Sequence, residues 1–499
     1  MNIFLAEITA WDPGTASVIT YRFASGPGYD NAGTFYAPRI ENPATFTRSM
    51  GGPDGGRAGV SYGELTLVNN DGALNAMADD YFDGRTLTLK YGDSAGAYGS
   101  FATILVAVIE AIAVEGSRVS VRLRDRTAAL DKPFSDVKYT GGNTLPTGVE
   151  GTPDDLKDQY KPRVLGRIAL MQPVLVNTSK LIYQVNAAAV DGVLQVYDGG
   201  AYLDKISGDY SDLTDLYNNE PASGSWRQLP GSGLFRLGSQ PVGQISCSVV
   251  ESWDYLDCTA AGLFERILTE QGYTSADWVA ADLATLNQQN AGSLGLIVEP
   301  GETTASLLDR IAQSVGAWWG CDALGRFRII RWDAPSGTPV ATFGDDDVLD
   351  IERQPDSQPP LWEVVIKADR NHAVQDKKSL AGVVPADRAA WFSQETRDQK
   401  AANSGIKTSR LLADTVTHDS ALNGIATAAA ESARRLALHS ARRDVVTIEA
   451  ANPAGTDIEL GDVINLTTSK LGYSGGRLMT VTSVRVDYQR NLINLACWG

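Results

Sequence analysis

The chain has 499 residues, 43% hydrophobic and 21% charged, a globular composition with length for about three or four domains. Its net charge of −17 argues against a duplex DNA-binding surface, because phosphate contacts need clustered Lys and Arg. Met1–Trp11 lacks the features of a signal peptide, and the most apolar stretch, Phe101–Val114, is too short to span a bilayer. We therefore expect a protein that is made in the cytoplasm and does not cross a membrane.

Residues 1–140 are predicted to form an all-β domain. Leu65 and Leu67 alternate with polar neighbours, a pattern typical of a strand with one buried face. Turn-forming residues follow at Asn69–Gly72. The glycine-rich stretch Gly51–Gly59 is predicted to be a loop, because neither Lys-Ser/Thr nor a helix follows it, as a phosphate-binding loop requires. The predicted strands are Asn2–Thr9, Ser17–Phe23, Leu65–Val68, Thr86–Tyr91, Ala102–Val114 and Ser117–Arg124.

Residues 141–250 are predicted to form a second β region. It opens with Thr140–Pro162, a polar segment rich in Gly, Pro and Asp that reads as a linker or inserted loop. The expected strands that follow are Val174–Val176, Leu181–Val185, Val193–Tyr197 and Leu234–Leu237.

Residues 251–335 are predicted to form an α+β helix–hairpin domain. Gly262–Gln271 and Thr303–Val315 have apolar residues at helical spacing, and Thr303 is a candidate N-cap. Ala317–Trp332 reads as a hairpin that turns at Asp322–Gly325. Its aromatic residues are expected to fill the core and interfaces, with an exposed carbohydrate platform as the alternative; they are Trp318, Trp319, Phe327 and Trp332.

Residues 336–415 are expected to form a strand and an extended polar arm, with a basic strand or arm in Val364–Val383. Residues 416–499 are expected to hold an Ala-rich helix, Ala421–Arg442, and closing β strands in which Val484, Val486 and Tyr488 alternate. A basic cluster lies at the end of this predicted helix and consists of Arg434, Arg435, Arg442 and Arg443. It is expected to favour the helix dipole, with a phosphate contact or an inter-subunit pair as the functional alternative.

No catalytic, cofactor-binding or metal-binding residue is predicted, and we expect a protein that is not an enzyme and needs no cofactor. The acidic segment Asp209–Glu220 lacks the ligand pattern of a calcium loop, and Asp345–Asp347 reads as a solvated turn. The histidines His372, His418 and His439 have no metal-ligand spacing. The cysteines are expected to be free and mostly buried, because they form no CxxC motif, while an iron–sulfur cluster stays open as the alternative; they are Cys247, Cys258, Cys321 and Cys497.

Five segments, in this order, carry a family resemblance. The first is Gly63–Gly92 (GELTLVNNDGALNAMADDYFDGRTLTLKYG), and the last is Asn491–Gly499 (NLINLACWG). Between them lie Lys161–Val176, Leu181–Gly192 and Leu234–Val250. Together they resemble the tail-tip (baseplate) hub proteins of long-tailed bacteriophages of the siphovirus type, whose tails do not contract. That family is related to the trimeric central hubs of contractile-tail baseplates.

The resemblance implies a mainly β, multi-domain homotrimer in the virion, with two barrel-like hub domains per chain. One barrel would be the N-terminal β region, and the other would combine residues 141–250 with the C-terminal strands. Such a hub closes the tail tube, contacts the distal tail ring protein, anchors the tape-measure protein and the central tail fibre, and opens for DNA ejection. DNA would pass through its lumen without sequence-specific binding.

Three other functions are open. A carbohydrate-binding tail-tip protein would use exposed Trp and Tyr side chains, and a peptidoglycan-degrading one would need two converging carboxylates. A tube or distal-ring protein would be a hexamer rather than a trimer.

Overall fold

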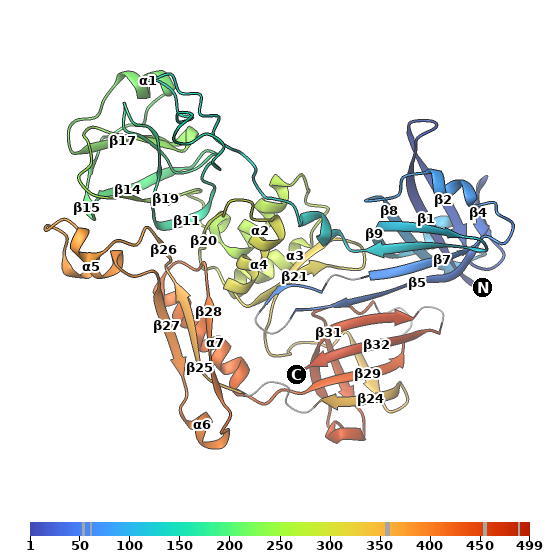
Figure 1. Ribbon diagram of the computed structural model, residues 1–499. Coiled ribbons are helices and arrows are strands. Elements are labelled where there is room, and N and C mark those ends of the chain that lie inside the picture. Colours follow the sequence, from blue (N-terminus) through green and yellow to red (C-terminus); the bar gives the residue numbers. More distant parts are fainter. Residues whose placement is uncertain (52–54, 60–61, 355–359, 453–456, 488–489) are drawn as a thin grey trace.

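The computed structural model describes residues 1–499 except 52–54, 60–61, 355–359, 453–456 and 488–489. The fold is mainly β and divides into several sheets, as the sequence predicts. The molecule is elongated (Figure 1), with the N-terminal and the C-terminal strands of the chain at one end. A second group of sheets lies at the other end, helices lie between the two, and a narrow sheet projects from the middle. The borders predicted at residues 140, 250, 335 and 415 stay predictions.

The N-terminal β unit (residues 2–124) is a strongly curved sheet. Leu65 pairs with Val121 and Leu67 with Val119, and all four side chains are buried, which confirms the predicted alternation. The predicted strands all form; the chain adds the short strands β3 and β4 and the long strand β5. The strands of this unit are β1 Asn2–Asp12, β2 Ser17–Ala24, β3 Tyr29–Asn31, β4 Thr34–Pro38, β5 Ile40–Ser49, β7 Tyr62–Val68, β8 Thr86–Asp93, β9 Ala102–Glu115 and β10 Arg118–Arg124.

Part of the glycine-rich stretch Gly51–Gly59 lies outside the described residues. In the described part, Gly56–Arg57 is the short strand β6, which pairs in parallel with Trp318 and Trp319. That segment therefore connects the N-terminal β unit to the helix–hairpin unit below.

The C-terminal β unit (residues 341–354 and 445–498) joins the same sheet. Ser49 pairs with Ser483, and Phe46 with Val486, so β5 and β31 make one 15-stranded sheet of both units. The alternation of Val484 and Val486 thus falls in a strand, while Tyr488 lies outside the described residues. The strands are β23 Ala341–Gly344, β24 Val348–Gln354, β29 Val445–Ala451, β30 Val463–Thr467, β31 Arg477–Asp487 and β32 Leu492–Trp498.

This pairing corrects the expected split barrel. The C-terminal strands pair with β5, β23 and β24, and not with strands of residues 141–250. The sequence hides β5 because Pro43 interrupts it and its register shifts between Asn42 and Thr45. A strand with a bulge and a proline lacks the regular alternation by which strands are recognised.

The middle β unit (residues 164–250) has two sheets, and its four predicted strands form within a few residues of their expected ends. Thr140–Pro162 is more than a linker, since Asn143 Nδ2 donates to the Val176 carbonyl oxygen at 2.7 Å and Leu156 is buried. The elements are β11 Val164–Met171, β12 Val174–Asn177, β13 Ile182–Gln184, β14 Gly192–Asp198, β15 Ala201–Tyr202, β16 Asp204–Lys205, α1 Leu213–Asn218, β17 Ser225–Leu229, β18 Leu234–Leu237 and β19 Ile245–Val250.

The helix–hairpin unit (residues 256–331) confirms the predicted helices and hairpin. The Thr303 hydroxyl accepts a hydrogen bond from Ser306 N at 3.1 Å, as an N-cap should. Trp318, Trp319 and Phe327 are fully buried and Trp332 nearly so, which confirms core packing and excludes an exposed platform at these residues. The elements are α2 Ala260–Glu270, α3 Ala280–Gln289, β20 Gly295–Ile297, α4 Thr304–Ser314, β21 Ala317–Cys321 and β22 Phe327–Arg331.

The arm unit (residues 361–440) is a folded sheet rather than an extended polar segment. Val364 and Ile366 are fully buried beneath α7, which packs along the sheet (Figure 1). The central strand β25 pairs in antiparallel with β27 and in parallel with β28. The elements are β25 Leu361–Ala368, β26 Asn371–His372, α5 Ala386–Phe392, β27 Arg397–Ala402, α6 Gly405–Ser409, β28 Asp414–Asp419 and α7 Ile425–Ser440.

Close backbone approach at Gly166 can be tested against a matched glycine. Gly166 has a φ of +74°, and a Cβ there would lie 2.2 Å from the Leu294 carbonyl oxygen; Gly208 has a φ of +81° with nothing within 4 Å. We expect Gly208→Ala to cost about 1–2 kcal/mol from its backbone conformation alone. Gly166→Ala should cost more than about 4 kcal/mol, because the backbone must also move. Urea unfolding measures both, and equal shifts would contradict the close approach.

Candidate functional site at the junction of the terminal β units

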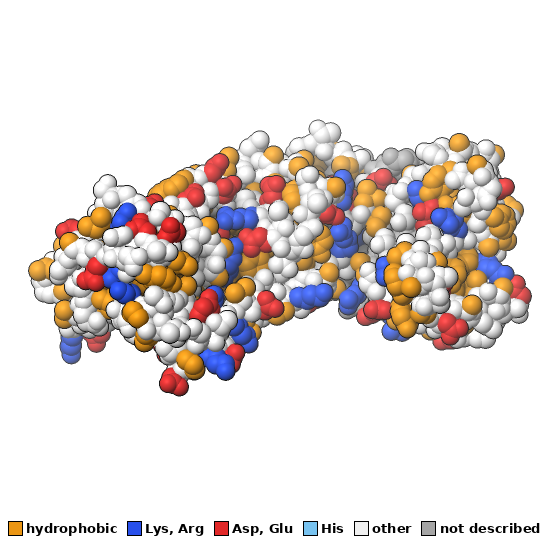
Figure 2. Space-filling view, turned by 90° about the horizontal axis from the view of Figure 1, so that it is seen from above, with side chains coloured by type: hydrophobic (Ala, Val, Ile, Leu, Met, Phe, Trp, Pro, Cys, Tyr) orange, Lys and Arg blue, Asp and Glu red, His pale blue; other side chains and the backbone are white. Residues whose placement is uncertain are grey.

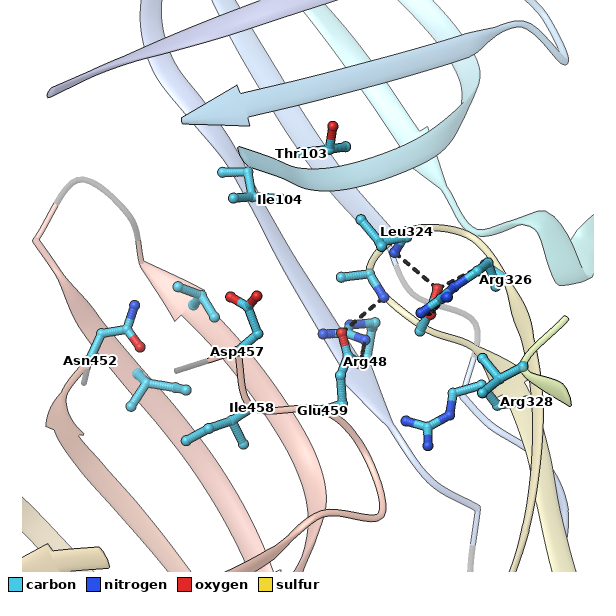
Figure 3. Close-up of a pocket in the computed structure, with 15 residues that line it drawn as sticks. Arg48, Thr103, Ile104, Leu324, Arg326, Arg328, Asn452, Asp457, Ile458 and Glu459 are labelled. Atoms are coloured by element: carbon cyan, nitrogen blue, oxygen red, sulfur yellow. Dashed lines mark hydrogen bonds and ion pairs between the residues drawn. The ribbon is translucent and has the colours of Figure 1, made fainter. Parts of the chain in front are cut away.

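A cavity of about 280 Å³ lies where three units meet (Figure 3). The N-terminal β unit contributes Arg48 from β5 and Ile104 from β9, and the helix–hairpin unit contributes the hairpin turn around Leu324. The C-terminal β unit contributes Ile458 and Glu459. Residues that are hundreds of positions apart in sequence therefore share one polar cavity beside the β5–β31 pairing.

The charged groups of this cavity neutralise one another. Arg48 forms an ion pair with Glu459, whose Oε1 also accepts from Ala323 N at 3.1 Å. Across the turn, the Asp322 carboxylate accepts from Leu324 N at 3.0 Å and from Arg326 Nε at 2.8 Å. The Glu459 carboxylate thus links Arg48 of the N-terminal β unit and Ala323 of the hairpin turn to its own C-terminal β unit.

The third arginine of the cavity is also paired. Arg328 Nε donates to Asp282 Oδ2 at 2.7 Å, which connects the hairpin to α3. Among the described residues the cavity lining contains no His, Cys or Ser. Each of the three arginines forms an ion pair with a carboxylate of the same chain. These ion pairs can therefore hold the three units together.

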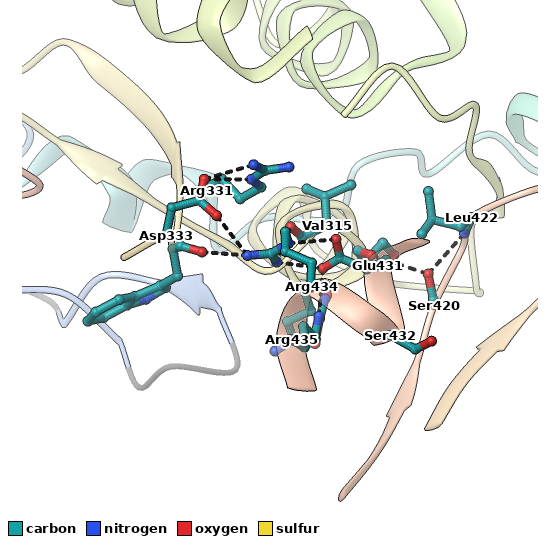
Figure 4. Close-up of polar contacts among 12 residues, drawn as sticks. Val315, Arg331, Asp333, Ser420, Leu422, Glu431, Ser432, Arg434 and Arg435 are labelled. Atoms are coloured by element: carbon teal, nitrogen blue, oxygen red, sulfur yellow. Dashed lines mark hydrogen bonds and ion pairs between the residues drawn. The ribbon is translucent and has the colours of Figure 1, made fainter. Parts of the chain in front are cut away.

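A second polar cluster fastens α7 to the helix–hairpin unit (Figure 4). The buried Glu431 accepts from Arg434 Nε at 2.9 Å and from Arg435 Nε at 2.6 Å. Arg434 also donates to the Trp332 carbonyl oxygen at 2.6 Å, and Arg435 to that of Gln313 at 2.5 Å. Burial alone would raise the pKa of Glu431, but the two guanidinium groups outweigh burial and hold that pKa below its ordinary value.

These contacts correct both readings of the basic cluster for Arg434 and Arg435. The two side chains lie inside α7 rather than in its last turn, so they do not act on the helix dipole. Arg435 is buried and Arg434 mostly so, and both bond to partners of the same chain, which leaves them unavailable to a phosphate. The sequence signal that was missed is the spacing from Glu431, three and four residues ahead, which places all three groups on one helix face.

The remaining two arginines of that cluster, Arg442 and Arg443, lie between α7 and β29. Arg442 lies 3.6 Å from the Asp444 carboxylate, and the Arg443 guanidinium lies 5.2 Å from the centre of the Trp498 ring. Asp444 is buried and also accepts from Arg353 at 2.7 Å. These cations therefore brace the point where α7 leads into β29.

The four cysteines are free and buried, as predicted. Cys247, Cys321 and Cys497 belong to three separate hydrophobic cores, and Cys258 lies beside the start of α2. Because one cluster needs all its ligands within a few ångströms, this placement excludes a shared four-cysteine site. Burial raises the pKa of each thiol, which keeps it protonated and unreactive near neutral pH.

The acidic segments have structural roles. Asp212 caps α1, because its side chain accepts from Asp215 N at 2.9 Å. Asp345 accepts from Ser469 N at 2.9 Å and from the Thr468 hydroxyl, so it fixes the predicted turn before Val348. In the described part of the chain, no group of three or more His, Cys, Asp or Glu residues is placed to hold a metal ion. Over the same residues, no helix has the length and apolar character needed to cross a membrane.

His372 lies in β26, against β11 of the middle β unit. Its Nε2 is buried and makes no hydrogen bond. Burial, reinforced by the charges of Arg370 and Arg310, lowers the pKa of His372 to about 4. The folded chain therefore holds this imidazole neutral at a pH where the unfolded chain would protonate it.

The Glu431 cluster predicts a large effect of one substitution. Glu431→Ala removes the buried carboxylate that pairs with both Arg434 and the buried Arg435, and we expect a loss of about 3–5 kcal/mol in unfolding free energy. Glu395→Ala is the matched control, because Glu395 pairs with Arg370 while remaining 66% exposed, and should cost less than about 1 kcal/mol. Urea unfolding would contradict a buried anchor if the two variants lost similar stability.

His372 predicts a pH dependence of stability. A lowered pKa means that stability is complete above pH 6.5 and is lost as the pH falls toward 4. Between pH 7.5 and 5.0 the wild type should therefore lose about 2 kcal/mol more than His372→Gln, which has no imidazole to protonate. Urea midpoints at both pH values measure this difference, and parallel pH profiles for the two proteins would refute it.

Three solved structures illustrate what the fold resembles. A tail protein from Neisseria meningitidis MC58 is 11% identical over 94% of each chain, with a TM-score of 0.43. The 43 kDa tail protein of prophage MuSo2 from Shewanella oneidensis is 12% identical over 100% of this chain and 98% of its own, with a TM-score of 0.40. A chain from the virion of a native gene transfer agent particle is 15% identical over 68% of this chain and 84% of its own, with a TM-score of 0.39.

No protein-family model matches the sequence. No curated protein matches it either. The first two of these structures are tail proteins, and the third is part of a virion.

Proposed function

We propose that this chain is a structural protein of a phage tail, and specifically the homotrimeric hub that closes the tail tube at the tail tip. The carrying observation is where the five resemblance segments fall. Gly63–Gly92 spans β7 to β8, Leu234–Val250 spans β18 to β19, and Asn491–Gly499 contains β32. Lys161–Val176 and Leu181–Gly192 cover β11 to β13. The family pattern thus coincides with core strands of three β units, as expected of a shared structural scaffold.

The use of the reactive side chains supports a role in contact rather than catalysis. Each cysteine lies in a core, and Trp318 and Trp319 are fully buried. Arg434 and Arg435 serve an internal anchor, and the arginines of the junction cavity are paired. We propose that the protein is not an enzyme.

The distribution of charge supports passage of DNA without sequence-specific binding. Figure 2 shows Asp and Glu interspersed with Lys and Arg over the face it presents, with apolar side chains between them. On a chain of net charge −17, such a mixed face favours weak rather than tight contact with phosphates. We propose a place in the virion, after assembly in the host cytoplasm, in contact with the distal tail ring, the tape-measure protein and the central tail fibre.

The hub predicts a definite assembly. Native mass measurement of the purified chain, alone and after co-expression with a distal tail ring protein, should give three times the chain mass of 53.3 kDa per hub. Class averages should show a closed ring with a central hole. A hexamer would favour a tube or distal-ring protein. A monomer under both conditions would overturn the hub.

A further inference from the structure

Two loops expose apolar side chains, one at the tip of the arm and one at its base. The arm tip (Lys407–Leu412) follows the start of α6 and presents Leu411 and Leu412, which are 91% and 84% exposed. The ledge (Trp253–Asp257) precedes α2 and presents Trp253, Tyr255 and Leu256, which are 57%, 45% and 55% exposed. Neighbouring apolar side chains that stand this far out of the surface are typical of a contact site.

The arm tip is held firmly at the far end of its sheet. Figure 1 shows α6 at the end of the arm away from the rest of the molecule. Ile406 is buried beneath the tip, and the Lys407 ammonium lies 3.5 Å from the centre of the Trp362 ring. The two leucines are therefore presented on an ordered turn.

The ledge is held in place by hydrogen bonds to its neighbours. Trp253 N donates to Asp191 Oδ2 at 2.6 Å, and the Tyr255 hydroxyl accepts from Ser293 N at 3.1 Å. Leu256 N donates to Asp254 Oδ1 at 2.9 Å. The backbone of the ledge and the Tyr255 ring are thus fixed before any partner arrives, which lowers the entropic cost of binding.

The two surfaces have complementary charge. The ledge carries Asp254 and Asp257 among its apolar side chains, whereas the arm tip carries Lys407 and Arg410. More broadly, residues 361–440 hold 11 Lys and Arg against nine Asp and Glu, while the whole chain holds 43 against 60. The arm therefore departs from the acidic balance of the whole chain, and the aspartates of the ledge on a second copy suit the cations of its tip.

The arm tip cannot reach the ledge of its own chain. The ledge lies at the base of the arm, where Ser293 bonds to Tyr255 and Leu294 bridges to Leu422. The six residues of β28, Asp414–Asp419, separate that base from the tip, a span of about 20 Å. Contact between the two surfaces thus requires two copies.

We propose that the arm tip of one copy docks on the ledge of a second copy. Leu411 and Leu412 would pack on the Trp253 and Leu256 side chains, with Lys407 and Arg410 facing the two aspartates. Such a head-to-tail contact uses two different surfaces of each copy, which is the kind of interface that closes cyclic rings. The proposal rests on the proposed trimer and names the surface that builds it.

Cross-linking between two singly substituted chains tests the contact directly. Since all four native cysteines are buried, Leu412→Cys in one tagged copy and Leu256→Cys in another would add the exposed thiols. Co-expressed and mildly oxidised, the pair should give a mixed disulfide dimer on a non-reducing gel. Leu412→Cys with Val18→Cys is the control, because Val18 is 53% exposed but lies in the N-terminal β unit. Equal yields from both pairs, or none from the first, would overturn the docking.

Assembly mass separates this contact from the hub itself. Replacing Leu411 and Leu412 together by Asn should weaken self-association at least tenfold, whereas Val18→Asn should leave it unchanged. A wild type and a double variant that form equally stable trimers would overturn the docking and leave the hub standing. A wild type that never forms trimers but gives the specific cross-link would overturn the hub and keep the docking. A wild type that forms neither trimers nor the specific cross-link would overturn both the hub and the docking.

Discussion

Pairing between β5 and β31 is the constraint on which the rest of this fold depends. It joins Phe46–Ser49 to Ser483–Val486, so that nearly the whole chain lies between two adjacent strands. Residues 125–340 leave the shared sheet after β10 and return to it at β23, and residues 361–440 lie between β24 and β29 of the same sheet. The middle β unit and the helix–hairpin unit are therefore held on one long excursion from the sheet, and the arm on a second. Such a closure is costly in chain entropy and needs specific contacts to define it.

Those specific contacts are buried or largely buried carboxylates that bind groups from more than one unit. Glu459 does so at the junction cavity, and Glu431 does so where α7 meets the helix–hairpin unit. Glu251 follows the same rule, because it accepts from Gly166 N at 2.6 Å and pairs with both Arg163 of β11's approach and Arg266 of α2. Burial raises the pKa of Glu251. The fold therefore keeps this carboxylate away from water, where it binds groups of two units. A buried carboxylate tolerates only the arrangement that supplies its donors, so these three groups fix how the units sit.

The sequence predicted individual strands and helices more readily than the pairing between distant strands. Alternation identified β7 and β10, and a threonine cap identified the start of α4, because both signals lie within a few residues. It missed β5, whose proline and bulges break the pattern, and α3, whose apolar face is narrow. The partner of β31 could not be read at all, since any edge strand with matching faces can accept another.

The same limit applied to the candidate site. The junction cavity draws Arg48, Asp322 and Glu459 from three distant segments, none of which stands out in its own neighbourhood. Arg434 and Arg435 did stand out, but as a basic cluster, because their carbonyl partners in residues 313–332 carry no sequence signature. Charge counted along a chain gives no information on whether that charge is already satisfied by the fold.

This distinction separates the interior cations from the exposed ones. Arginines inside the molecule form ion pairs that fix one unit to the next. The elongated body therefore keeps a defined arrangement of its units. Lys407 lies instead beside exposed leucines on a projecting arm, and Asp254 and Asp257 lie beside exposed rings on a fixed ledge. The length of the arm separates these two surfaces within one chain. The arm tip can therefore contact a ledge only on a second copy, and the rigid body fixes the angle between the two copies. Because that angle is set by the internal anchors, the buried carboxylates that hold the units in place also set the geometry of the assembly.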